Sequence, residues 1–146
     1  MADDELAAVT RWVIQNRVFM FYGNGGTFSG EAFERWFTEL EATADLRLYV
    51  GAAGSTFTFG ADERSRANSY FKQKKLRFAV ITESVRLRML GQTARLIGLN
   101  LGLYSWKSSF EPFAELGLEK SLAENLYAKL LKLREDVELE LQSLGR

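Results

Sequence analysis

The side chains best suited to chemistry lie together in one glycine-rich stretch, residues 51–62. Ser55, Thr56 and Thr58 carry hydroxyls that suit phosphorylation or hydrogen bonding to a ligand, and Arg64 follows as a partner for an anion. Asp62 is the expected N-cap of the next helix. Two interpretations stay open: a recognition or phospho-acceptor surface, or a loop whose role is structural.

A second glycine-rich stretch, residues 23–27, follows a run of apolar residues and precedes an expected helix. Backbone N–H groups at Gly25 and Gly26, together with the helix dipole, suit an anion. The stretch lacks the Lys-Ser/Thr pair of a P-loop, and Phe28 stands where a dinucleotide-binding motif has its last glycine. It is therefore read either as an anion site or as a plain turn.

The composition excludes several kinds of catalysis, because the chain contains no His and no Cys. Without them there is no Ser-His-Asp triad, no thiolate nucleophile and no cysteine-based metal site. The carboxylates of residues 31–41 lie on the polar face of an expected helix, and nothing near them would shift a pKa. We expect a non-enzymatic protein without a metal or another cofactor.

Nineteen basic and nineteen acidic residues give a net charge of zero, so no overall field favours nucleic acid or an anionic membrane. The clustered basic residues are read as solvated helix faces, and no nucleic-acid partner is expected. The cluster consists of Arg64, Arg66, Lys72, Lys74, Lys75, Arg77, Arg86, Arg88 and Arg95. The acidic N-terminus has no signal-peptide pattern, and no apolar run is long enough to span a membrane, so we expect a cytoplasmic protein.

The centre of the chain predicts half of a βαβ unit. Residues 76–84 have the β-branched and aromatic composition of a buried strand, and residues 85–101 repeat apolar side chains at helical spacing. The repeat consists of Val85, Met89, Leu96 and Leu99, with Leu90 and Ile97 beside them. Gly102 is expected to end this helix, and residues 103–106 form the next strand.

Elements of the same kinds are expected before this unit. Residues 9–22 favour a hairpin that turns at Gln15-Asn16, although a helix over 6–14 is the alternative. Phe33, Trp36, Phe37 and Leu40 form a core-facing helical stripe, strand 46–50 follows it, and a helix spans about 62–73. The predicted fold is α/β, with a mostly parallel four- to five-stranded sheet, an N-terminal hairpin and crossover helices.

The C-terminal part of the chain predicts one short helix and one long helix. The short one begins near Ser109 and stops at Gly117, and the long one covers 119–144, about 39 Å at 1.5 Å per residue. We expect a domain over 1–118 and an amphipathic helix over 119–146 that packs on this domain or on a partner. Because the stripe is longer than one face of such a domain, part of it should overhang as an interaction surface: Leu133, Val137, Leu141 and Leu144.

The chain resembles the STAS domain of bacterial anti-sigma-factor antagonists, and more narrowly the SpoIIAA-like single domains. The resemblance covers about residues 9–118 and rests on residues 18–23, 27–33, 77–84, 103–106 and 110–118. It implies a regulatory module that binds a protein partner or a second copy. It also implies a phosphorylated Ser or Thr after the third strand, where this chain has Ser55, Thr56 and Thr58 without a preceding Asp.

Three functions follow from the sequence. The first is a non-enzymatic protein-interaction module, which could act as a homodimer. The second is binding of a small anionic ligand, such as a nucleotide or lipid, through loops 23–29 and 51–62. The third is an enzyme of unknown chemistry.

Overall fold

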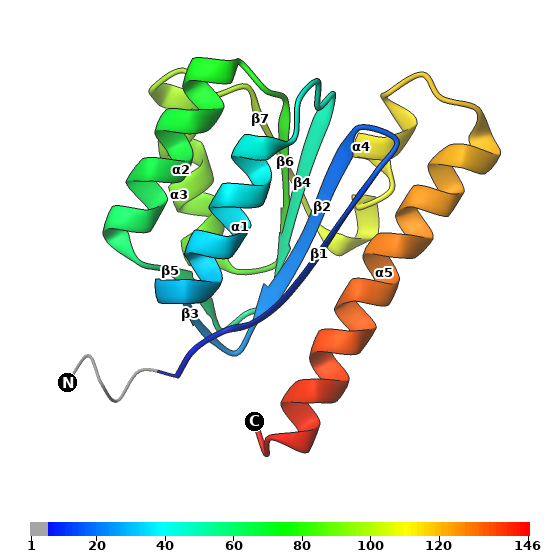
Figure 1. Cartoon of the computed structure of the whole chain (residues 1–146). Helices are drawn as coiled ribbons and strands as arrows, with labels where there is room; N and C mark the ends of the chain where they lie inside the picture. Colours follow the sequence, from blue (N-terminus) through cyan, green and yellow to red (C-terminus); the bar gives the residue numbers. More distant parts are fainter. Residues whose placement is uncertain (1–5) are drawn as a thin grey trace.

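The computed structural model describes residues 6–146 as a three-layer α/β/α arrangement (Figure 1). Residues 1–5, on which the expectation about a signal peptide rests, lie outside the described part. Elements follow in the order β1 (Val9–Gln15), β2 (Val18–Asn24), β3 (Gly26–Phe28), α1 (Gly30–Ala42), β4 (Leu48–Ala53), β5 (Phe57–Phe59), α2 (Ala61–Lys74), β6 (Phe78–Thr82), α3 (Val85–Leu96), β7 (Leu101–Tyr104), η2 (Trp106–Ser108), α4 (Glu111–Ala114) and α5 (Lys120–Ser143).

The main sheet has five strands in the order β1-β2-β4-β6-β7. Only the β1–β2 pair is antiparallel, and the other three pairs are parallel. The α/β class, the mostly parallel sheet, the N-terminal hairpin and the long C-terminal helix are therefore confirmed. The hairpin turn is displaced by one residue from its expected place, because Asn16 and Arg17 both adopt the positive φ angles that a tight hairpin turn requires.

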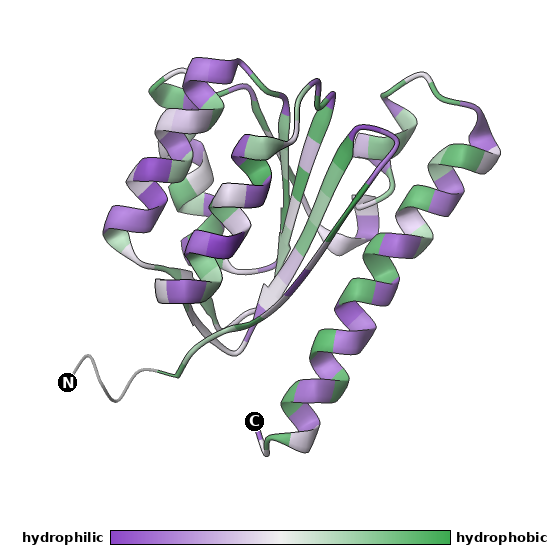
Figure 2. Ribbon diagram, in the orientation of Figure 1, coloured by the Kyte–Doolittle hydropathy of each residue, from purple (hydrophilic) through white to green (hydrophobic). Residues whose placement is uncertain are grey.

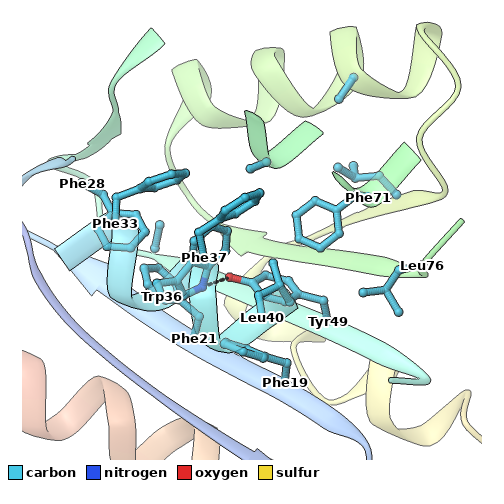
Figure 3. Close-up of a cluster of buried hydrophobic side chains, with 14 of the residues drawn as sticks. Phe19, Phe21, Phe28, Phe33, Trp36, Phe37, Leu40, Tyr49, Phe71 and Leu76 are labelled. Atoms are coloured by element: carbon cyan, nitrogen blue, oxygen red, sulfur yellow. Dashed lines mark hydrogen bonds between the residues drawn. The ribbon is translucent and has the colours of Figure 1, made fainter. Parts of the chain in front are cut away.

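One face of the sheet carries an aromatic core beneath α1, α2 and α3 (Figures 1 and 3). The expected stripe of Phe33, Trp36, Phe37 and Leu40 is confirmed, since all four side chains are buried. The indole Nε1 of Trp36 donates to the Tyr49 hydroxyl at 3.0 Å, and Figure 3 shows this bond inside the cluster. Burial raises the pKa of Tyr49 far above its ordinary value of 10.0, so its hydroxyl stays protonated.

The other face is covered by α5 and α4 (Figure 1). Apolar and polar residues alternate along α5, and its buried residues meet β1 and β2 (Figure 2). The expectation that this helix overhangs the sheet is wrong for Leu133, Val137 and Leu141, which are 9%, 0% and 4% exposed. The reason is that α5 packs along β1 and β2, and near its end Leu141 lies against Gly25 in the turn after β2. Leu144 alone of the four stays exposed.

The predicted central unit needs two corrections. Helix α3 ends at Leu96 because Gly98, with φ +100°, breaks it, and the next strand begins at Leu101. The face of α3 that meets the sheet holds Leu87, Gly91 and Ala94. Of the expected apolar repeat, Leu99 is buried and Leu90 packs partly buried against the core. Val85, Met89, Leu96 and Ile97 are instead exposed to solvent.

The structure also contains a short parallel pair, β3–β5, that the sequence did not predict. It joins the end of the β2 strand to the loop after β4, and Ala7 adds one further bridge to Thr27. The two glycine-rich stretches identified in the sequence are thus tied to each other. No helix among residues 6–146 is long and apolar enough to cross a lipid bilayer.

Candidate functional site

The β3–β5 pair forms part of the floor of a wide hollow of about 1000 Å³ at the carboxyl ends of the parallel strands. This is the edge where open α/β sheets place their ligands. The hollow brings together residues of both glycine-rich loops, including Gly25, Gly26, Thr56 and Thr58. We call it the arginine hollow, because its charged lining residues are Arg64, Arg86 and Arg146.

The hydroxyls of the two loops hold the hollow in shape. Thr56 Oγ1 donates to Asn24 Oδ1 at 2.9 Å and accepts the N–H of Gly25 at 3.1 Å. Thr58 and Thr27 share a bond between their hydroxyls at 2.9 Å. Since these hydroxyls are engaged in joining the loops, their direct role is structural, and a ligand would meet them only as secondary partners.

Backbone N–H groups of the first loop also form hydrogen bonds within the protein. They are the donors on which the expected anion site depended. The Gly25 N–H bonds Thr56, and the Thr27 N–H donates to the Leu6 carbonyl at 2.9 Å. These two amides are therefore occupied within the protein. Positive charge for an anion comes instead from guanidinium groups, of which the sequence had singled out only Arg64.

The three arginines reach the hollow from different elements. Arg64 lies in the first turn of α2, Arg86 lies in the first turn of α3, and Arg146 follows α5. Arg146 is fixed in place, because its Nη1 donates to the carbonyls of Ala7 and Gly25 at 2.8 and 3.3 Å. Among residues 6–146, neither Arg64 nor Arg86 forms an ion pair. Periodicity could not have predicted this convergence, since the three residues are far apart in the chain.

Two other residues singled out by the sequence lie outside the hollow. Ser55 is exposed at the tip between β4 and β5 and does not line it. Asp62 is not the N-cap of α2, because the helix begins one residue earlier and Gly60 takes that position. The Glu63 side chain lies over Gly60, where a Cβ would stand, so it fills the space beside the helix start.

An apolar slot of about 90 Å³ adjoins the arginine hollow and shares Phe59 and Arg64 with it. It lies between α2, α3 and the sheet, and it leaves Phe78 and Val80 only half-buried. The sequence predicted a buried strand over residues 76–84, and these two side chains depart from that prediction for this reason, whereas Phe19 of β2 is 0% exposed. The slot is smaller than the usual ligand cavity of about 300–1000 Å³.

The opposite edge of the sheet has a hollow of a different character. It measures about 580 Å³ and is lined by Glu41 and Asp45 together with Arg47, Lys74, Lys75 and Arg77. Its two acidic residues offset part of the charge of the four basic ones. It lies at the amino ends of the parallel strands. The arginine hollow, with charge of one sign at the carboxyl ends, is therefore the better candidate for binding an anion.

Comparison of the chain with models of protein families, with curated proteins and with solved structures finds no match. The function is therefore argued from the arginine hollow itself. Among residues 6–146 there is no cluster of three or more acidic side chains arranged to hold a metal ion.

Proposed function

We propose that the protein is a cytoplasmic, non-enzymatic binding module whose arginine hollow holds the phosphate or carboxylate group of a small ligand. The observation that carries this proposal is the meeting of Arg64, Arg86 and Arg146 at one hollow between the two loops. Guanidinium groups suit phosphate and carboxylate because their planar donors match two oxygens at once.

The proposal fits the chemistry of the remaining side chains. No base is needed for binding, and the absence of His and Cys from the sequence excludes an imidazole base and a thiolate nucleophile. We also propose a relationship to STAS domains, supported by the hairpin start and the alternation of helices with parallel strands.

The test uses pyrophosphate and citrate as separate probes, titrated into the full chain by calorimetry and by backbone NMR. We expect saturable binding of at least one probe, with shifts concentrated at Gly26, Thr58 and Arg64. Arg64→Gln should weaken binding about tenfold, which corresponds to the loss of one charged hydrogen-bonding group. Arg35→Gln, on the exposed face of α1, is the matched control for the loss of one positive charge.

The melting temperature of Arg64→Gln should stay close to that of the wild type, because Arg64 forms no ion pair with residues 6–146. If neither probe binds, or if both bind equally well to Arg64→Gln, the arginine hollow is not an anion site. A variant that unfolds instead would show that Arg64 is structural.

A second candidate is the protein-interaction module expected from the sequence, favoured by the exposure of Ser55 at the loop tip beside the hollow. Native mass spectrometry of the purified protein separates the two candidates. A bound small anion supports the first, and a mass of two chains that Ser55→Glu returns to one chain supports the second.

A further inference from the structure

Helix α3 presents large apolar side chains to solvent on the side that faces away from the sheet. Val85 is 72% exposed, Met89 is 62% exposed and Leu96 is 87% exposed. At 3.6 residues per turn these three positions fall on one stripe along the helix. Ile97, at the C-cap, is 50% exposed beside the end of this stripe. We call these four residues the α3 face.

The inward side of α3 explains why the larger side chains are outside. A Cβ on Gly91 would lie 2.6 Å from Leu103 Cδ2, so the helix approaches β7 closely at this position. Gly91 and Ala94 make that approach possible because they are small, and Leu87 completes the buried side. The larger apolar side chains of α3, which would normally pack in the core, therefore point away from the sheet, and nothing within residues 6–146 covers them.

The charged residues of α3 itself all have one sign. Arg88 and Arg95 flank the stripe on one side and Arg86 flanks it on the other, and α3 contains no acidic residue. Lys72 of α2 adds a positive charge at the far end, with its Cε 3.6 Å from where a Cβ on Gly98 would stand. The acid just before the helix, Glu83, is turned away, since its carboxylate accepts the Trp106 N–H at 2.8 Å.

We propose that the α3 face docks on the surface of a bilayer that contains anionic phospholipids. A helix with an apolar stripe between cationic flanks lies in the plane of such a surface, with its apolar side chains at the acyl boundary and its arginines at the phosphates. The stripe is short, so apolar contact alone would bind weakly. The arginines and Lys72 supply the second attraction that stable association requires.

The same charges argue against a second copy of this chain as the occupant. A symmetric contact between two α3 faces would bring the arginines of one copy against those of the other. Val85, Met89 and Leu96 also line neither the arginine hollow nor the apolar slot, so neither of these hollows offers a peptide groove that includes the face. A flat anionic surface fits both properties.

The experiment measures co-sedimentation of the full chain with vesicles of two compositions, pure phosphatidylcholine and an equal mixture with phosphatidylglycerol. We expect binding to the mixed vesicles only, and weaker binding as salt is raised. Met89→Asp and Leu96→Asp should each weaken it about tenfold or more, because each places a carboxylate at the acyl boundary. Leu139→Asp is the matched control, since Leu139 is 56% exposed on α5.

Circular dichroism and melting curves check that the variants fold, which is expected because the substituted side chains are exposed. Failure of the wild type to bind mixed vesicles at low salt would overturn the proposal, as would equal binding by all three variants. A dimer that Leu96→Asp turns into a monomer would assign the face to a second copy. The inference does not depend on the proposed anion site, because Arg64→Gln should weaken the binding of pyrophosphate or citrate and leave vesicle binding intact.

Discussion

The side chain of Asn24, at the end of β2, bonds Glu138 of α5 and Thr56 of the loop after β4, and it thereby joins the two elements. Its Nδ2 donates to Glu138 Oε2 at 2.8 Å, and its Oδ1 accepts the hydroxyl of Thr56 at 2.9 Å. Tyr22 donates to the same carboxylate oxygen at 2.7 Å. Position 54 requires Gly54, because a Cβ there would overlap the Asn24 side chain. This network fixes one wall of the arginine hollow to the helix on the other side of the sheet.

Replacing Asn24 with Ala should therefore both destabilise the protein and increase the mobility of the loop after β4. It leaves the Thr56 hydroxyl and Glu138 each without one partner, and we expect a loss of about 1–3 kcal/mol in the free energy of unfolding. Urea denaturation measures the loss, and hydrogen exchange at residues 54–58 reports the loop. Asn100→Ala, at an exposed position, is the control. Equal stability of the two variants would contradict the proposed role of the network.

Two phenylalanines of the aromatic core should differ in their contribution to stability. Phe19 is 0% exposed, whereas Phe78 borders the apolar slot and is half-buried. Phe19→Ala should cost about 3–5 kcal/mol, the range for a large core aromatic. Phe78→Ala should cost less, about 1–3 kcal/mol, because part of its surface already meets solvent. Guanidinium denaturation of both variants gives the comparison, and a larger cost at Phe78 would mean that the slot is closed in solution.

Helix α5 should tolerate a charge on one side and not on the other. Val137 is 0% exposed against the sheet, and Leu139, two residues further on, is 56% exposed. Val137→Asp should lower the free energy of unfolding by several kcal/mol, about 3 or more, because it buries a carboxylate without a partner. Leu139→Asp should leave it nearly unchanged. If Val137→Asp keeps its fold and dissociates a dimer instead, α5 is an interaction helix as the sequence had suggested.

The ion pair of Glu34 and Arg66 should make part of the free energy of unfolding depend on pH in the acid range. Arg66 donates two hydrogen bonds to the Glu34 carboxylate, at 2.6 and 3.2 Å, and these bonds lower the pKa of Glu34 below its ordinary value of 4.5. A lowered folded-state pKa stabilises the fold above the unfolded value, and this contribution disappears as the pH falls through the lowered pKa.

The stability difference between wild type and Glu34→Gln should thus be constant near neutral pH and shrink in the acid range below 4.5. Urea denaturation over that range measures it, and Glu31→Gln on the same helix controls for the loss of one charge. Because the pair is exposed, the effect is small and should weaken in high salt. A difference that grows on acidification would show that the pair does not form in solution.

The sequence by itself determined the elements and much of the core. Short apolar runs rich in β-branched and aromatic residues identified the five main strands, and apolar residues at helical spacing identified α1, α3 and α5. Phe33, Trp36, Phe37 and Leu40 show this most clearly, since their spacing alone defines the buried side of α1. The absence of His and Cys likewise excludes imidazole and thiolate chemistry from this chain, because composition does not depend on how the chain folds.

The tertiary structure decided which apolar stripe is buried and which residues meet. On α3 the repeat of Val85, Met89 and Leu96 predicted the wrong side, because the small Gly91 lets the helix approach Leu103 more closely than a larger side chain would allow. A hydrophobic pattern records the apolar side chains of a helix but not the distance at which that helix packs. Nor does any local pattern place Arg146 beside the same hollow as Arg64, since that arrangement exists only after α5 has folded along the sheet.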